Sequence, residues 1–505
     1  MRSLLALSLL GFALACRGEH ANLSNEMPQT LTPYLAYGRS QPVTWQGWYP
    51  ETFKLAGRFD RPILLAIGAG ACRACAQMDR ETYDDPMLAA VIDSLFIPVR
   101  VDADERPDLA HRYETAVNVL TGLRGYPLTV FLTPEGSAFF GGTYFPADDP
   151  LTGRGMRQIL PEVARSFHAQ HAFVLRHAAL VHQLAYQRAE GARGVLGAAL
   201  VARGVDSVRE ALAIALREHA RVGTLDGAEG AALLFEAASG NTPADSSDLD
   251  VARGVLDVYV DSAQVPDFED APSLERAAAL SALIVGWQRT ADPRYREAAR
   301  VELDTLVRQA SSGERVVFTD REAFVMGALL RAGAALGDTP ALQVAQGNLD
   351  TLLAGAYVPT QGTRHAPGPP TAMPLLLGDQ VELASACLTA AAATKDQRYL
   401  GFAEDLIAVV ERGFADPTGG YFDANGADPV APAFGERTKQ VLDGALPGAN
   451  AAAAAVLIGL TDATHEPGFR QRAEATLEAF AGQLPSAGLR AATYLRAAEA
   501  ILPQR

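Results

Sequence analysis

The sequence has few cysteines, a deficit of positive charge and few long apolar runs. Four cysteines in 505 residues are too few for a disulfide framework, so any thiol chemistry must belong to particular cysteines. Lys and Arg number 43 against 59 Asp and Glu, a net charge of −16 that disfavours nucleic acid and anionic membrane surfaces as partners. After the first 16 residues no apolar run is long enough to predict a transmembrane helix.

The overall composition is that of a folded globular chain. Apolar residues make up 49% and charged residues 20% of the sequence, which is too hydrophobic for long disorder. At roughly 100 to 200 residues per domain, the length predicts two to four domains.

Residues 1–16, MRSLLALSLLGFALAC, have the layout of an export signal. A basic residue, a short apolar run and a small residue precede Cys16, and a cysteine at this place resembles the bacterial lipobox, in which the thiol is lipidated. We expect a signal peptide over 1–15, a tether over 16–32 and a lipid anchor at Cys16. The mature protein would then lie in the cell envelope, on the periplasmic or extracytoplasmic side. A plain cleaved signal with an incidental cysteine is the alternative.

Two cysteines, Cys72 and Cys75, follow a predicted buried strand. The segment 61–70, RPILLAIGAG, is apolar between Pro and Gly, and helical spacing follows the second cysteine, so the thiols should lie on a strand-to-helix turn. The helix N-terminus and the cation of Arg73 should lower the pKa of Cys72, as disulfide exchange requires. A structural disulfide or half of a zinc site are alternatives, but a second C-x-x-C motif is absent; we expect neither a metal nor a cofactor.

The pattern around the cysteines predicts an α/β thioredoxin-like domain over residues 33–165. A second strand in SLFIPVRVDAD, a helix around 108–119 and a hairpin in LRGYPLTVFLTPEGSAFFGGTYF complete an alternating β/α/β order. In thioredoxin-like folds the proline before the strand that faces the thiols is cis. We therefore predict a cis Tyr126–Pro127 bond lying against Cys72, and expect Arg73, Tyr126 and Pro127 to contact a partner protein.

The remaining chain is Ala-rich and helical in pattern. A weak repeat begins near Thr290, Leu336, Thr394 and His465, and each unit joins two helices through a turn. About twelve candidate helices between 206 and 501 make six hairpins. We predict a helical linker over 166–205 and an all-α (α/α)6 toroid over 206–505, with inner helices lining a central cleft. Trp45, Trp48 and Cys387 are expected in the core.

Several motifs resemble the spermatogenesis-associated protein 20 family. In the first domain these are TLTPYLAYGRSQPVTWQGWYPETF, CRACAQMDRETYDD, VDADERPDLAHRYETA and TGLRGYPLTVFLTPEG; in the second they include RHAPG, LLGDQVELA, FADPTGGYFDANG and DGALPGANAAAAAVL. The resemblance implies redox-like geometry and a barrel similar to sugar epimerases and six-hairpin glycosidases. Family members usually have histidines inside and just after the thiol pair, where this chain has Arg73 and Ala76. It also has Asp267 and Asp270 in place of the family's His and Lys, and Arg321-Glu322 in place of Trp-Asn.

Few acid–base groups remain in the predicted cleft of the toroid. They are His365, Asp379, Asp423, Asp443 and Asn450, on loops or helix starts, where Asp is commonly a helix cap. Glycosidases need two carboxylates roughly 5 to 10 Å apart, which a sequence does not show. We expect the toroid to be a binding or scaffolding module, or a degenerate enzyme.

Three functions therefore compete. The leading one is an anchored thiol–disulfide oxidoreductase that acts on a redox partner protein through Cys72 and Cys75. The alternative is a carbohydrate-active or carbohydrate-binding barrel, with a carbohydrate as its partner. The third is a non-catalytic envelope protein that uses the first domain for docking.

Overall fold

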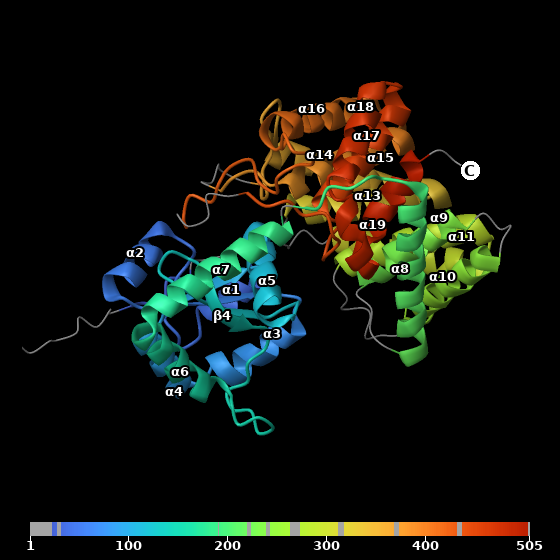
Figure 1. Cartoon of the computed structure of the whole chain (residues 1–505). Coiled ribbons are helices and arrows are strands. Elements are labelled where there is room, and N and C mark those ends of the chain that lie inside the picture. Colours follow the sequence, from blue (N-terminus) through green and yellow to red (C-terminus); the bar gives the residue numbers. More distant parts are fainter. Residues whose placement is uncertain are drawn as a thin grey trace, which may run out of the picture.

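The computed structural model describes residues 23–27, 32–189, 191–219, 224–238, 243–262, 273–311, 318–367, 373–431 and 437–502. The expected signal peptide, Cys16, Asp267 and Asp270 lie outside these ranges. An α/β thioredoxin-like domain lies beside an all-α (α/α)6 toroid (Figure 1). No helix in the described ranges combines the length and apolarity needed to cross a bilayer.

A four-stranded sheet in the order β2-β1-β3-β4 forms the centre of the first domain. Its strands are β1 (Ile63–Gly68), β2 (Ile97–Asp102), β3 (Leu128–Leu132) and β4 (Ala138–Gly142). β1 pairs parallel with β2 and antiparallel with β3, which also pairs antiparallel with β4. Every residue of β1 and β2 is buried, because helices cover both faces of the sheet.

In the described part of this domain seven helices surround the sheet, and several begin with a proline, which suits the first turn of a helix. They are α1 (Pro33–Gly38), α2 (Pro50–Phe59), α3 (Arg73–Met78), α4 (Pro86–Leu95), α5 (Pro107–Thr121), α6 (Met156–Ala169) and α7 (His171–Ala189). A π-helical turn, Asp79–Tyr83, continues α3. Leu64 and Ala66 pack in one core cluster with residues of α3, α4 and α6, whereas the alternate residues of β1 pack in the other, with α5. The expected core residues Trp45 and Trp48 are 0% and 6% exposed.

The predicted helical linker over 166–205 is wrong, because its two halves belong to different domains. α7 packs against α5 and β4, and its Val174, Ala178 and Val181 are buried in the first domain. α8 (Ala198–Glu218) instead packs against helices of the toroid. An apolar face on each helix thus fixes it to one core, and the chain crosses between domains over 191–197.

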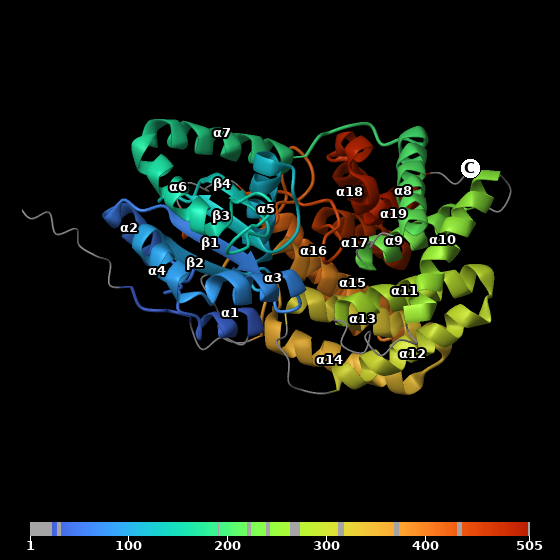
Figure 2. The ribbon, with the colours of Figure 1, turned by 90° about the horizontal axis from the view of Figure 1, so that it is seen from below.

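Twelve helices form the toroid in the described part of the chain, the number that the sequence predicted. The inner ones are α9 (Thr224–Ala237), α11 (Ser273–Thr290), α13 (Thr319–Leu336), α15 (Leu377–Thr394), α17 (Ala449–Thr464) and α19 (Ala492–Ile501). The outer ones are α8, α10 (Pro243–Ser262), α12 (Pro293–Ala310), α14 (Thr339–Ala356), α16 (Arg398–Gly413) and α18 (Pro467–Glu478). Each inner helix packs on the next, and α19 closes the ring on α9 (Figure 2). A short hairpin follows α14; its strands, β5 (Tyr357–Val358) and β6 (Gly362–Thr363), have two residues each. Cys387 on α15 is 0% exposed, in the core as expected.

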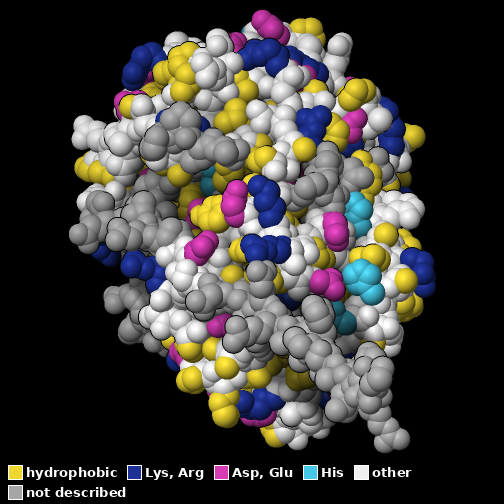
Figure 3. All heavy atoms as spheres, turned by 90° about the vertical axis from the view of Figure 1, so that its left-hand side faces the viewer, with side chains coloured by type: hydrophobic (Ala, Val, Ile, Leu, Met, Phe, Trp, Pro, Cys, Tyr) yellow, Lys and Arg dark blue, Asp and Glu magenta, His cyan; other side chains and the backbone are white. Residues whose placement is uncertain are grey.

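The two domains meet at the amino-terminal ends of inner helices. Arg321, in the first turn of α13, forms an ion pair with Asp104 at 2.6 Å. Asp428, from the loop after α16, accepts hydrogen bonds from Arg106 at 3.1 Å and from the indole of Trp48 at 3.0 Å. The side of the molecule opposite the toroid shows basic and acidic side chains interspersed (Figure 3).

Candidate functional site

The cysteine pair lies where β1 passes into α3. Cys72 and Cys75 form a disulfide. Cys72 is the N-cap of α3, and its sulfur accepts a hydrogen bond from the backbone N–H of Cys75 at 3.0 Å. Cys72 is half-buried, whereas Cys75 is only 2% exposed. A partner from solvent would therefore reach the sulfur of Cys72 and not that of Cys75.

Gly68, the last residue of β1, makes room for the disulfide. A Cβ at this position would lie 2.9 Å from the sulfur of Cys75 and 2.7 Å from the ring of Tyr34. Distances this short are shorter than van der Waals contact, so a larger residue would displace the disulfide or the ring. The glycine thus lets Cys75 pack directly on the sheet.

The Tyr126–Pro127 bond is cis, as predicted. Because Leu128 pairs with Ile67, the strand register brings Pro127 beside Gly68, at the same end of the sheet as the disulfide. The side chain of Tyr126 is 37% exposed, and Arg73 is exposed as well. Both views place α3 on the side of its domain that faces the toroid (Figures 1 and 2).

Asp102 is a buried carboxyl group next to this site that the sequence analysis did not single out. It pairs with Gly68 across β2 and β1, and the side chains of paired strand residues point to the same face of a sheet, here the face of Cys75. Asp102 is 2% exposed. Burial, aided by the charge of Asp104, raises its pKa to about 6. It can therefore exchange a proton near neutral pH close to Cys75.

A buried ion pair holds the cysteine-bearing segment against the sheet. Both carboxylate oxygens of Asp79, in the π-helical turn after α3, accept hydrogen bonds from Arg100 of β2 at 2.7 Å. The Arg100 guanidinium lies 3.6 Å from the ring centroid of Tyr34 and donates to the Tyr34 carbonyl oxygen. This bidentate contact ties α3, α1 and β2 together.

Two predicted cleft residues, His365 and Asp379, come together at the domain interface. His365 Nδ1 lies 2.9 Å from Asp379 Oδ1 and 3.9 Å from Asp320 Oδ1, and His365 Nε2 lies 2.8 Å from the backbone oxygen of Asp104. Burial alone would lower the pKa of His365, but the charges of Asp379 and Asp320 outweigh it and raise the pKa to about 10. The imidazole is therefore protonated at neutral pH. We call His365, Asp379, Asp320 and Asp104 the interdomain latch.

The interdomain latch also has the residue types of a metal site. Ligand atoms of Asp320, His365 and Asp379 lie within 4.8 Å of one another. Both ring nitrogens of His365 nevertheless face oxygen acceptors, so both carry a proton. A metal ion that bound Nδ1 would have to displace the proton on that nitrogen.

The other three predicted cleft residues hold loops of the toroid in place. Asp443 accepts hydrogen bonds from the backbone N–H groups of Gly448 and Thr493, and Asn450 makes three hydrogen bonds to the backbone of Tyr421 and Gln440. Asp423 accepts a backbone hydrogen bond from Gln440 and a side-chain one from Thr438. The N-caps of the adjacent helices α17 and α19 are Gly448 and Ala491, so Asp423 and Asp443 hold loops together in place of the expected capping.

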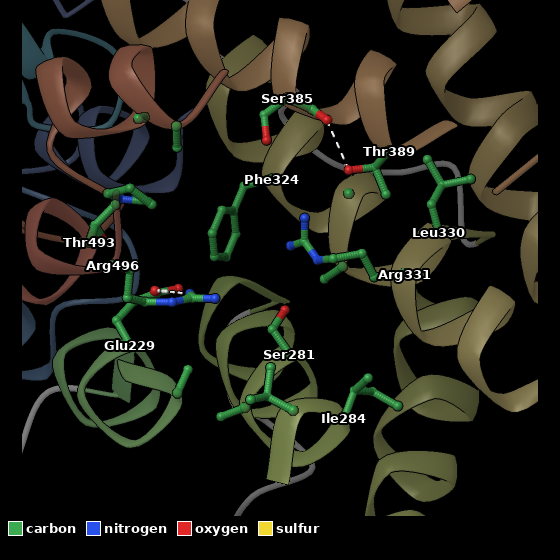
Figure 4. Close-up of a pocket in the computed structure, with 18 of the residues that line it drawn as sticks. Glu229, Ser281, Ile284, Phe324, Leu330, Arg331, Ser385, Thr389, Thr493 and Arg496 are labelled. Carbon is green, nitrogen blue, oxygen red and sulfur yellow. Dashed lines mark hydrogen bonds and ion pairs between the residues drawn. The ribbon is translucent and has the colours of Figure 1, made fainter. Parts of the chain in front are cut away.

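The toroid encloses a cavity of about 820 Å³, and none of the five predicted cleft residues is among the described residues that line it. Its lining comes from all six inner helices and is rich in alanine. Five charged residues of this lining were missed by the sequence analysis: Glu229, Glu236, Arg331, Glu382 and Arg496. Figure 4 labels Glu229, Arg331 and Arg496 among them.

Together, the sheet, the thiol pair at a strand-to-helix turn and the cis proline define residues 32–189 as a thioredoxin-like domain. Residues 24–185 match the family model Thioredox_DsbH, described as a protein of unknown function, DUF255. The chain is 32% identical to human spermatogenesis-associated protein 20 over 166 residues, which are 33% of this chain and 21% of the human protein. It is 34% identical to an uncharacterized Caenorhabditis elegans protein over 146 residues, 29% of this chain and 20% of the worm protein. The resemblance seen in the sequence is confirmed over this domain, and the matched segments span about a fifth of these relatives' length.

The toroid also has solved structural neighbours. An unsaturated glucuronyl hydrolase specific for heparin aligns with a TM-score of 0.48 at 12% identity, over 60% of this chain and 97% of that one. A sugar epimerase from a ruminal bacterium aligns with a TM-score of 0.39 at 12% identity, over 51% and 74% of the two chains. At this level of likeness nothing about activity follows.

Proposed function

We propose that the protein is an exported, lipid-anchored thiol–disulfide oxidoreductase whose toroid is a binding module. The observation that carries the proposal is the asymmetry of the cysteine pair: Cys72, at the start of α3, is partly exposed, whereas Cys75 is buried against Gly68. A reachable attacking thiol and a protected resolving thiol are what two-step disulfide exchange requires.

The exchange proceeds through a mixed disulfide. In the reduced protein the thiolate of Cys72 attacks a disulfide sulfur of the partner, which forms an intermolecular disulfide and releases one partner thiolate. Cys75 then attacks the sulfur of Cys72, which releases the second partner thiolate and leaves the Cys72–Cys75 disulfide. Two electrons pass to the partner, and a dithiol donor must return them for another cycle. Run backwards, the same steps oxidise a partner dithiol.

Asp102 is suited to accept the proton that Cys75 loses before it attacks. Its carboxyl lies on the same sheet face as Cys75 and ionises near neutral pH. We expect Asp102→Asn to slow resolution of the mixed disulfide about tenfold or more near pH 7, because the buried thiol then lacks a nearby base. Stopped-flow measurement of resolution against pH tests this: the native rate should rise through about pH 6, and the variant should lack this inflection. An unchanged profile would remove Asp102 from the mechanism.

The same substitution has an expected effect on stability. The pKa of Asp102 in the folded protein lies above its unfolded value, so the folded state binds more protons between about pH 4 and 6, and stability falls as pH rises through this range. Asn cannot ionise, so the Asp102→Asn variant does not lose this stability as the pH rises. The free energy of unfolding of the variant, relative to that of the native protein, should therefore be higher at about pH 7.5 than at about pH 4.5. Urea unfolding at the two pH values measures it, and a constant gap would contradict the assigned pKa.

Trapping the mixed disulfide tests the proposed activity directly. Because Cys75→Ser leaves Cys72 without a resolving thiol, this variant should accumulate adducts with partner proteins in intact cells, visible on non-reducing gels. Cys72→Ser is the matched control and should form none, since Cys75 is buried. Equal adducts from both variants, or none from Cys75→Ser after mild reduction, would overturn the proposal.

Labelling with a membrane-impermeant reagent tests the location of the protein. Metabolic lipid labelling of Cys16→Ser tests the anchor.

A second candidate is a small-molecule site in the toroid, of which carbohydrate binding is the case proposed from sequence. The enclosed cavity favours it, since about 820 Å³ is within the range of ligand pockets. A thermal-shift screen with mono- and oligosaccharides tests the carbohydrate version, and no stabilisation by any sugar would count against it.

A further inference from the structure

Among the described residues that line the cavity of the toroid, Arg331 is a cation that makes no contact with a carboxylate. Arg331 of α13 lines the cavity and is exposed to it, and neither a hydrogen bond nor an ion pair joins it to another described residue. Its guanidinium lies over Gly327, where a Cβ would be 3.6 Å from Nη1. Figure 4 shows it pointing into the cavity between Phe324 and Thr389. Its N–H donors are therefore free to bind a ligand.

The other arginine of the lining, Arg496 of α19, is already neutralised. It forms ion pairs with Glu229 and with Glu236, the latter at 2.8 Å. These contacts use both edges of its guanidinium. The contrast between the two arginines assigns the ligand-binding role to Arg331.

A buried carboxyl group also faces the cavity. Glu382 of α15 is 5% exposed, and its buried oxygen Oε1 has no hydrogen-bond partner among the described residues. Burial, aided by the charge of Asp320, raises the pKa of Glu382 to about 8. At neutral pH this group is a carboxylic acid, so it can donate a hydrogen bond and does not repel an anion.

The rest of the lining limits the ligand. Glu229 and Glu236 together carry one more charge than Arg496 neutralises, so a dianion such as phosphate would meet more repulsion than a monoanion. The hydroxyl groups of Ser281 and Thr389 donate to backbone oxygens of their own helices, at 2.9 Å each, and keep lone pairs to accept from a ligand hydroxyl. Phe324 adds an apolar wall.

Exposure along the inner helices shows where the cavity opens. Its exposed lining residues include Gln288, Ala334, Ala392 and Ala500, all near the carboxyl-terminal ends of their helices. The opposite ends meet the thioredoxin-like domain through Arg321 and the interdomain latch. A ligand would therefore enter from the side away from the first domain.

We propose that the toroid binds a small hydroxylated monocarboxylate, with its carboxylate on Arg331, a hydrogen bond from Glu382 and its hydroxyl groups on Ser281 and Thr389. The carboxylate fits the planar guanidinium in a bidentate way. This inference rests on the toroid acting as a binding module and is independent of the redox proposal.

Thermal unfolding of the full chain with millimolar lactate, gluconate and glucuronate tests the site, with sorbitol, glucose and phosphate as comparison probes. At least one monocarboxylate should raise the unfolding temperature by about 2 °C or more. The shift should vanish in Arg331→Met and persist in Arg300→Met, a control on the exposed surface of α12. No shift with any of the three acids, an equal shift with sorbitol, glucose or phosphate, or a full shift in Arg331→Met would overturn the proposal.

Ionisation of Glu382 gives a second readout. Binding should weaken about tenfold between about pH 7 and pH 9.5 in the native protein, because the ionised carboxylate repels the ligand. Glu382→Gln, which cannot ionise, should bind equally at both pH values; a native affinity that does not change would contradict the role of Glu382. The Cys72→Ser/Cys75→Ser protein should bind as the native one does, so failure of the redox proposal and failure of this one are distinguishable.

Discussion

Arg100→Met is expected to destabilise the thioredoxin-like domain by about 3–5 kcal/mol, because it leaves the Asp79 carboxylate buried without a cation. The side chains of Arg100 and Asp79 are 0% and 5% exposed, so water cannot replace the lost contact. The stacking of the guanidinium on Tyr34 is lost as well. The segment that carries Cys72 and Cys75 should loosen in consequence, with faster exchange of its amide hydrogens.

Urea unfolding followed by tryptophan fluorescence measures this loss, since Trp45 and Trp48 lie in this domain and Trp45 is next to Arg100. Two comparisons make the test specific. The double variant Asp79→Leu/Arg100→Met should lose less stability than Arg100→Met alone, because no buried charge remains unpaired. Arg154→Met, which breaks an exposed pair with Glu162, should cost less than about 1 kcal/mol. A similar cost for Arg154→Met and Arg100→Met would show that the buried pair has no special role.

The interdomain latch should make the stability of the protein depend on pH. The pKa of His365 rises from 6.5 to about 10 in the folded protein, so its contribution is complete below about pH 6.5 and is lost as pH rises through about 10. We expect the native protein to lose several kcal/mol of stability over this range. We expect His365→Gln to be less stable than the native protein at about pH 6.5, by about 3 kcal/mol, and to change less with pH.

Hydrogen exchange locates this effect. In His365→Gln the amides around Asp104 should exchange faster, because the imidazole donates to the Asp104 backbone oxygen. Amides of β3, which is not part of the latch, serve as the internal control. If both proteins showed the same stability profile between about pH 6.5 and 10, the imidazole would not be charged in the folded state. The two domains would then be held together by other contacts, such as that of Arg321 with Asp104.

The first domain could be predicted well from the sequence because its signals are local. A short apolar run predicted β1, the turn to α3 followed from the residues around Cys72 and Cys75, and the place of Pro127 before β3 gave the cis bond. Asp102 was missed, because a carboxylate after an apolar strand is an ordinary loop residue until strand pairing sets it beside Gly68.

The toroid could be predicted in its number of helices but not in its site. Helical periodicity repeats along the chain, whereas the cavity exists only when α19 closes on α9. Glu229 and Arg496 are 267 residues apart in the chain, and each looks like a solvent-facing charge on an Ala-rich helix. The latch was equally hidden, since Asp104 and His365 are 261 residues apart. A signal that could have pointed to Arg331 and Glu382 is that each is followed in its helix mostly by small and apolar residues.

The contact of the loop after α16 with the first domain has a practical consequence for dissecting the protein. Ala431 is 0% exposed and belongs, with Trp48 and Val181, to one apolar cluster against which Val430 also packs. A truncated protein that ends within residues 191–197 would lack Asp428, Val430 and Ala431. The apolar residues of the first domain that pack against Val430 and Ala431 would then be exposed, and Arg106 would keep only its ion pair with Asp108. We expect such a fragment to aggregate in solution. Redox assays should therefore use cysteine variants of the intact chain and not the isolated first domain.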